Sequence, residues 1–286
     1  MVFGLLAYLL WGLFPAFFPL LLPAGPVEIL AHRIVWTAVL MVLVLTALKG
    51  WGELRRASRR TWLLLVTAGV LISANWGIYV LAVNSGHVAD AALGYFINPL
   101  LSVLLAVVFL GDRLNRMQLV AVGIATLGVL QLTFLSGQAP VMALGMAITF
   151  GFYGLVKKRV QVSPRASLTA ETLVIAPLGI VYLVWLESTG QGTFFSEGPV
   201  HTTLLVVSGL VTTAPLLLFG MAAKRLPLAT IGMIQYLTPT MQMLWALFVT
   251  QEYLSPARWV GFIIIWVAVA IYLADIVRRR RHHQVR

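Results

Sequence analysis

The sequence predicts an all-α polytopic membrane protein, and three observations favour this fold class. Hydrophobic residues make up 60% of the 286-residue chain and charged residues only 10%. The hydrophobic residues gather in ten stretches, each close to the ~20 residues that a helix needs to cross a ~30 Å hydrocarbon core. The basic residues lie almost entirely in alternate loops between these stretches. Because the backbone in lipid must satisfy its own hydrogen bonds, each stretch is expected to form a transmembrane helix.

The ten expected spans follow one another through short loops, which leave no room for a water-soluble domain. They are predicted at residues 2–22, 28–48, 62–83, 88–110, 117–135, 140–156, 168–187, 201–223, 228–250 and 259–277. The first span lacks the basic start of a signal peptide, and it is longer than the apolar core of a signal peptide. We therefore expect it to remain in the mature protein. The chain contains no cysteine, which excludes disulfides and thiolate metal sites. No metal or cofactor is expected.

The basic residues predict the orientation. Eighteen of the twenty Lys and Arg residues fall on one side of the predicted membrane, in segments 49–60, 111–118, 157–167, 224–225 and 278–286. Only Arg33 and Arg258 fall on the other side. The positive-inside rule then places both termini in the cytoplasm, in a protein of the inner membrane. We expect the basic cytoplasmic tail, 278–286, to contact lipid headgroups and not nucleic acid, despite the net charge of +11.

The two halves of the chain resemble each other. A shift of 140 residues superposes Pro99 on Pro239 and Asp112 on Glu252. These matches predict two five-helix repeats, 1–137 and 138–277. Because five is odd, the second repeat crosses the membrane in the opposite sense, and such inverted repeats place a substrate site at the midplane and permit alternating access. Channels also contain inverted repeats, so the pattern indicates transport without choosing between carrier and channel.

Five prolines are expected near mid-depth in their spans, and each removes a backbone donor from its helix. They are Pro15, Pro99, Pro177, Pro215 and Pro239. Two interpretations remain open at this point. The kinks serve helix packing alone, or they splay the helices around a cavity that flexes between states.

Ionisable residues inside spans are costly and usually functional. Glu28, His32 and Arg33 lie together at the outer start of the second span. Glu28 and Arg33 form a structural ion pair, or Arg33 receives a substrate carboxylate, or His32 carries a proton. Glu28 and His32 are both proton-coupling candidates. Glu171, at the inner start of the seventh span, is either a capped or snorkelling carboxylate near the interface or a third proton-coupling candidate. Asp90, Asp112 and Glu252 are expected to be structural caps of the fourth, fifth and tenth spans.

Deeper in the spans lie aromatic and amide side chains that suit an amphipathic organic solute better than a bare ion. The set contains Trp11, Asn75, Trp76, Tyr79, Tyr95, Asn98, Tyr153, Gln235 and Tyr236. With Arg33, these are the candidate substrate-binding residues, in a cavity between spans near 1, 3, 4, 6, 8 and 9. The alternative is interhelical hydrogen bonding without a ligand. No catalytic residue is expected, since the P-loop, H-E-x-x-H and G-x-S-x-G motifs are absent.

Several stretches carry a resemblance to a known family. The run from Asn84 to Leu100, with Gly94-Tyr95-Phe96-Ile97-Asn98-Pro99 at its centre, resembles the signature of the RarD-type permeases of the EamA family, in the drug/metabolite transporter superfamily. His32-Arg33, Asn75-Trp76, Glu171-Thr172-Leu173 and Gln235-Tyr236 match as well. The chain departs from the pattern at Asp90 and Asp112, where members commonly have Glu.

The resemblance implies the drug/metabolite transporter fold and a secondary transporter. It would move small organic solutes, such as amino-acid-like metabolites or drugs, across the inner membrane by alternating access, as an exporter. Its expected partners are the solute, the lipid bilayer and protons, with no nucleic acid, and it would be a monomer or a homodimer. The residues leave one rival open, a non-transporting membrane protein such as an intramembrane enzyme or a flippase-like component.

Overall fold

A computed structural model of the protein describes residues 1–84, 88–136, 141–249, 251 and 255–284. Every regular element in these ranges is a helix. The elements are α1 (Val2–Gly12), α2 (Phe14–Phe17), η1 (Phe18–Leu21), α3 (Pro26–Ala47), α4 (Trp51–Arg55), α5 (Arg59–Asn84), α6 (Val88–Leu110), α7 (Arg116–Ser136), α8 (Val141–Arg159), α9 (Pro164–Ser188), α10 (Gly198–Arg225), α11 (Leu228–Gln235), α12 (Leu237–Phe248) and α13 (Pro256–Gln284). The side chains of Asp90 and Glu252, both predicted caps, lie outside the described residues.

The all-α membrane fold is confirmed, with one difference in the predicted spans. Nine stretches of the described residues are long and apolar enough to cross a membrane. The ninth predicted span, 228–250, is divided into α11 and α12, which meet at Tyr236. Pro239 lacks an N–H and therefore leaves the carbonyl of Gln235, four residues earlier, without its helical donor. The interruption lies at the turn from which that bond is missing.

The mid-span prolines act in two ways. Near Pro15 the first span breaks into α1, α2 and η1, and near Pro239 the ninth breaks into α11 and α12. Pro99, Pro177 and Pro215 instead lie inside continuous helices. The two broken spans come from opposite halves of the chain and lie against each other, because α1 contacts both α11 and α12.

The strongest helix contacts join one half of the chain to the other. The pairs are α6 with α8, α7 with α13, α3 with α9, α3 with α10, α5 with α8, α6 with α11, and α1 with α10. If α1, α3, α5, α6 and α7 are exchanged for α8, α9, α10, α11–α12 and α13, each pair becomes itself or another observed contact. For example, α5 with α8 becomes α10 with α1, and α3 with α10 becomes α9 with α5. This packing supports the predicted duplication, and the boundaries 1–137 and 138–277 stay a prediction.

Glycine allows the two halves to approach closely. A Cβ on Gly209 of α10 would lie 2.6 Å from the backbone carbon of Trp36 in α3, and one on Gly232 of α11 would lie 2.7 Å from the carbonyl oxygen of Pro99 in α6. Small residues at such crossings bring membrane helices into backbone contact. The hydroxyl of Thr37 uses this proximity and donates to the Gly209 carbonyl at 3.1 Å.

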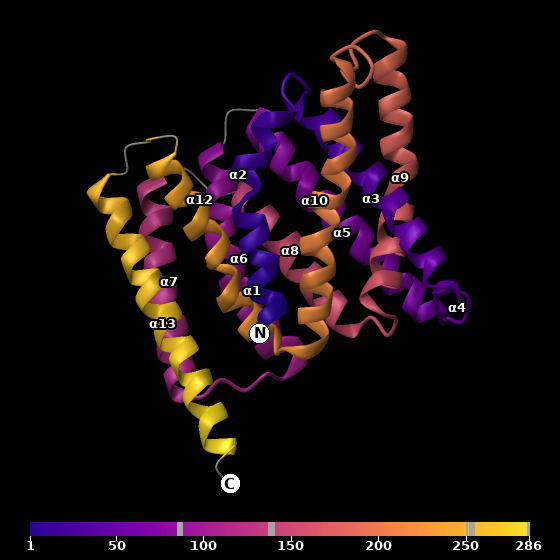
Figure 1. Ribbon diagram of the computed structural model, residues 1–286. Coiled ribbons are helices and arrows are strands. Elements are labelled where there is room, and N and C mark those ends of the chain that lie inside the picture. The colour runs from indigo at the N-terminus through magenta and orange to yellow at the C-terminus, as the bar shows by residue number, and fades with distance from the viewer. Residues whose placement is uncertain (85–87, 137–140, 250, 252–254, 285–286) are drawn as a thin grey trace.

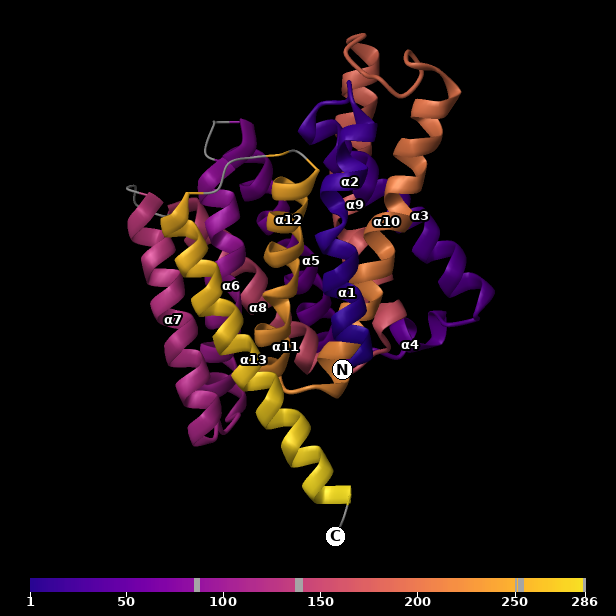
Figure 2. The same ribbon diagram turned by 60° about the vertical axis from the view of Figure 1, so that its left-hand side comes forward.

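One end of the bundle collects the basic loops. Both termini, α4 and the start of α9 lie toward the same end, and the α9–α10 connection lies at the other (Figure 1). Figure 2 shows α7 and α13 together at one edge and α3, α4 and α10 toward the opposite edge. The predicted cap Asp112 lies at the basic end but accepts from the Ala229 N–H of α11 at 3.5 Å, while Asn115 caps α7 by accepting from the Gln118 N–H at 3.0 Å. The cap predicted for the fifth span was therefore assigned to the wrong residue.

A short polar link holds α4 against α9. The Glu53 carboxylate accepts from the N–H and the hydroxyl of Ser163, at 2.7 and 2.9 Å, and lies 3.6 Å from the Arg165 guanidinium. Burial alone would raise the pKa of Glu53, but these donors outweigh it and hold that pKa below its usual range. Glu53 is therefore charged at neutral pH and fixes α4 to the first turn of α9.

Candidate functional site

The first candidate site surrounds Arg33, two turns into α3. Its side chain is only 8% exposed. The guanidinium carbon lies 5.4 Å from the ring centre of Phe14 and 5.0 Å from those of Phe18 and Trp76. These rings come from α2, η1 and α5, so the break in the first span brings two of the three aromatic faces to the cation. Aromatic faces attract a desolvated guanidinium.

Among the described residues, no acidic side chain neutralises Arg33. Its Nε donates to the hydroxyl oxygen of Thr212 in α10 at 2.9 Å, which is a neutral partner from the other half of the chain. The ion pairs among the described residues are Lys157–Glu171 and Arg165–Glu53. The interpretation of Glu28 and Arg33 as a mutual ion pair is therefore wrong for the described structure. Buried charges in membranes normally pair with an opposite charge or face a substrate pathway.

Glu28 has other partners. Its carboxylate is 3% exposed and accepts from the N–H and hydroxyl of Thr193, at 2.7 and 2.9 Å. The Thr193 hydroxyl also lies 2.8 Å from Nε2 of His201. Because that hydroxyl gives its proton to Glu28, the imidazole nitrogen must be the donor. Glu28 is thus joined through Thr193 to a histidine that the sequence did not single out.

His32 lies beside this chain of hydrogen bonds. Its Nδ1 accepts from the Trp36 indole at 3.3 Å, and its ring stacks on Phe194 with centres 4.9 Å apart. Its Nε2 is buried and has no hydrogen-bond partner among the described residues. A nitrogen with this freedom can exchange a proton when water or a ligand reaches it.

Two tyrosines, from α5 and α6, add to the Arg33 site. Tyr79 of α5 and Tyr95 of α6 contact each other with ring centres 6.3 Å apart, and both lie within electrostatic range of the guanidinium. Asn75, one turn from Tyr79, points elsewhere: its amide donates to the Met146 carbonyl at 2.8 Å and to Thr149 at 3.0 Å. The predicted residues Arg33, Trp76, Tyr79 and Tyr95 therefore come together, while Asn75 joins α5 to α8.

A second group of predicted residues lies around the break between α11 and α12. Asn98, Gln235 and Tyr236 are at most 5% exposed, and each has a side-chain oxygen that finds no partner in the described part of the chain. The hydroxyl of Tyr8 in α1 is in the same condition. Unpaired buried polar atoms are rare and call for an explanation. Their position along α1, α6 and α11, where the broken spans meet, is where discontinuous helices bind substrate in transporters.

Trp11 and Tyr153 belong to an aromatic cluster instead. Trp11 contacts Tyr8, Phe150 and Phe219 with ring centres 5.4 to 5.9 Å apart. Tyr153 is fully buried and stacks on Phe219 at 5.7 Å. This cluster joins α1, α8 and α10 between the Arg33 region and the basic end of the bundle.

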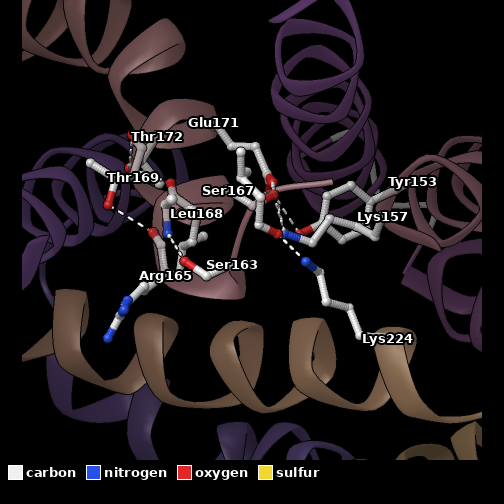
Figure 3. A network of polar contacts seen from close by, with 12 residues as sticks. Tyr153, Lys157, Ser163, Arg165, Ser167, Leu168, Thr169, Glu171, Thr172 and Lys224 are labelled. Atoms are coloured by element: carbon white, nitrogen blue, oxygen red, sulfur yellow. Dashed lines mark hydrogen bonds and ion pairs between the residues drawn. The ribbon is translucent and has the colours of Figure 1, made fainter. Parts of the chain in front are cut away.

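Glu171 forms a closed network at the other end of that cluster (Figure 3). Its carboxylate is fully buried and lies 2.7 Å from the Lys157 ammonium. The hydroxyl of Ser167 donates to the same oxygen, and Tyr153 donates to the other at 3.1 Å. Lys224 approaches from α10, and its ammonium donates to the Val162 carbonyl.

This network corrects two sequence interpretations. Glu171 is not a capped or snorkelling carboxylate, because no part of it is exposed. Lys157 was assigned to a loop after a span ending at 156, but α8 continues to Arg159 and buries Lys157 to 3% exposure. The residue that compensates Glu171 was therefore counted among the basic residues of the loops.

Comparison with known proteins identifies the family of the chain. The family model described as EamA-like transporter family matches residues 1–134 and again 138–274. The chain is 45% identical to Protein RarD of Streptomyces exfoliatus, over 100% of this chain and 91% of the relative. It is 42% identical to the uncharacterized transporter YojE of Bacillus subtilis, over 98% and 95% of the two chains. A Pseudomonas aeruginosa relative named Chloramphenicol-sensitive protein RarD is 32% identical, over 97% and 94%.

A solved crystal structure shares the fold. It aligns over 95% of this chain and 96% of its own, with a TM-score of 0.75 and 19% sequence identity. At that identity the likeness concerns the fold alone. The family model covers almost all of the chain and the named relatives are aligned nearly end to end, so this multi-pass membrane protein belongs to the EamA-like transporter family.

Proposed function

We propose that the protein is a secondary transporter for small organic solutes that carry a carboxylate, such as amino-acid-like metabolites or anionic drugs. The observation that carries this proposal is the buried Arg33 guanidinium, which has aromatic faces and the neutral Thr212 hydroxyl as neighbours and no acidic partner among the described residues. An anionic solute would supply the missing charge. Arginine is suited to this role because its planar fork binds both oxygens of a carboxylate.

The neighbours of Arg33 suit the rest of such a solute. Phe14, Phe18 and Trp76 offer apolar ring area, and Tyr79 and Tyr95 add one hydroxyl each. Sites for organic ligands are mostly apolar with a few placed polar groups. Arg33 lies seven residues after Pro26, which corresponds to about 10 Å along the helix. The solute would therefore first be held between one membrane face and the midplane, with Asn98, Gln235 and Tyr236 as the next polar groups along α6 and α11.

We further propose alternating access between the two halves, with export as the direction and cytoplasmic termini in the inner membrane. Alternating access is supported by the exchange symmetry of the helix contacts and by the broken spans that meet where α1 contacts α11. The cytoplasmic position of the termini is supported by the basic loops at the same end of the bundle. Proton coupling would use Glu28 and His32 at one end or Glu171 at the other. The family model is that of a transporter family and two relatives are named uncharacterized transporters, so we propose no catalytic role.

The test compares matched solutes. Purified protein in liposomes, with and without a pH gradient, is assayed with radiolabelled phenylalanine and phenylalaninamide and with other carboxylate and amide pairs. Wild-type protein should transport carboxylates in preference to their amides. Arg33→Gln should abolish this preference, and Arg33→Lys should weaken it because the ammonium lacks the bidentate fork. Arg258→Gln, at an exposed arginine of α13, is the matched control and should behave as wild type.

The outcome that contradicts the proposal is specific. If Arg33→Gln folds, with a wild-type elution profile and melting temperature, and still prefers carboxylates, Arg33 does not bind the anionic group. If no carboxylate is transported but neutral or cationic solutes are, the family function holds and the proposed substrate class is wrong.

A further inference from the structure

We infer that the protein carries a specific site for an anionic phospholipid, in a recess between α4, α5 and α9. The recess has a volume of ≈ 400 Å³. It is lined by Trp51, Leu54, Arg55, Trp62, Ala170, Leu173 and Val174. None of these residues belongs to the Arg33 site or to the polar atoms around the α11–α12 break.

The wall of the recess is apolar. The lining residues Leu54 and Ala170 are only 3% and 1% exposed. The polar atoms of both tryptophans are already bonded: the Trp51 indole N–H donates to Thr46 at 2.9 Å and that of Trp62 to the Leu54 carbonyl at 3.2 Å. The rings therefore present hydrocarbon surface to the recess. Such a wall suits an acyl chain and offers little to a polar solute.

The rim of the recess is open to the surroundings and basic. Trp62 and Leu173 are each 39% exposed, so the recess meets the outer surface of the bundle between α5 and α9. Arg55 lines it directly, and Arg56, Arg59 and Arg60 follow within five residues, all exposed. Clusters of basic residues beside a membrane helix attract anionic lipid headgroups, and tryptophan favours the headgroup level. An acyl chain in the recess would place its phosphate beside Arg55.

The recess is built into the fold, because α4 is fixed to α9. Glu53, on the same short helix as Leu54 and Arg55, is held by Ser163 and Arg165 at the start of α9. The wall residue Ala170 is adjacent in sequence to Glu171, the centre of the buried network. A lipid in the recess would therefore contact both helices of this connection and stabilise it.

Native mass spectrometry of the detergent-purified protein tests the site. Phosphatidylglycerol, phosphatidylcholine and inorganic phosphate are added separately at equal concentration, and the bound mass identifies the ligand. Phosphatidylglycerol should be retained more strongly than phosphatidylcholine, and inorganic phosphate should not be retained. Arg55→Gln should reduce the preference about fivefold. Leu173→Trp should fill the recess and lower retention of both lipids.

Two matched control variants separate binding in the recess from general binding to the protein surface. Arg113→Gln removes an exposed arginine at the same end of the bundle, and Leu178→Trp adds the same ring to α9 at a residue 73% exposed and outside the recess. Both should bind as wild type. If Leu173→Trp does not fold, Val174→Trp replaces it. Equal retention of the two phospholipids, binding of phosphate alone, or equal loss in Arg55→Gln and Arg113→Gln would overturn the inference. Because no transport is measured, the result is independent of the proposed substrate.

Discussion

The buried pair of Lys157 and Glu171 gives a prediction with a large expected effect. Replacing Glu171 with Leu would leave the Lys157 ammonium 3% exposed, with a hydrogen bond to Ser167 at 2.8 Å and the Tyr153 ring centre at 5.7 Å. Removing one partner of a buried ion pair costs about 3–5 kcal/mol, because the other charge stays buried without compensation. Glu171→Gln keeps the hydrogen-bonding shape and should lie at the lower end of this range.

The assay is the melting temperature of the purified protein in one detergent. At ~2–4 °C per kcal/mol for a chain of this size class, Glu171→Leu should melt ~6–20 °C below wild type. Glu197→Gln, an exposed carboxylate at the start of α10, is the control and should change little. Lys157→Met combined with Glu171→Leu should recover most of the loss, since an apolar pair of similar volume is often as stable as the buried ion pair.

Two results would refute this reasoning. If Glu171→Leu melts within 1–2 °C of wild type, the free energy of the pair is below ~1 kcal/mol and the network does not stabilise the contact between α8 and α9. If the double variant melts as low as the sum of the two single variants, the residues act independently and the coupling energy of the cycle is near zero.

Three further predictions concern other parts of the chain. Glu53→Gln should lower the melting temperature at pH 7. The folded protein holds the pKa of Glu53 below 4.5, so its stabilisation is present above pH 4.5 and is lost as the pH falls through the folded pKa. A difference in melting temperature between wild type and variant that is undiminished at pH 3 would contradict this prediction. Tyr236→Phe should melt at or above the wild-type temperature, because the Tyr236 hydroxyl has no partner among the residues that the structure describes. A loss of several degrees would show a missed hydrogen bond. Cysteine at Gln191 should react with an impermeant thiol reagent in intact cells while cysteine at Ser58 should not; the reverse pattern would overturn cytoplasmic termini.

The helices could be predicted from the sequence because lipid constrains them so strongly. Nine of the ten predicted spans agree with stretches of the structure that can cross a membrane. The exceptions have local causes. To predict the break at Tyr236, one must know that Pro239 interrupts the ninth span. Pro99, Pro177 and Pro215 lie inside helices that stay continuous. A proline signals a missing donor, and tertiary packing then decides whether the helix bends or breaks.

Charge partners were harder to predict than helices. Glu28 and Arg33 lie together at the start of the second predicted span, which suggested a pair, but their partners are Thr193 and Thr212 from the other half of the chain. Lys157 was assigned to a loop because it opens a basic run. Helical spacing carries no information on contacts across 165 or 179 residues, so only the folded arrangement identifies them. One local signal was missed, the spacing of Phe14 and Phe18, which places both rings on one helix face.

The two buried cations differ in a way that separates their roles. Lys157 has a carboxylate, a hydroxyl and an aromatic face around it, so its charge is compensated in the resting structure. Among the described residues, Arg33 has aromatic faces and one neutral hydroxyl around it and no acidic side chain, and we propose that a bound anion compensates its charge. A compensated ion pair contributes to the stability of the fold, whereas an uncompensated buried charge contributes to the free energy of binding when an anionic ligand pairs with it. The apolar double variant at residues 157 and 171 makes the difference measurable. If it folds and still transports carboxylates with the same dependence on Arg33, the pair is structural. If it folds and binds but no longer transports, breaking the pair is a step of the transport cycle.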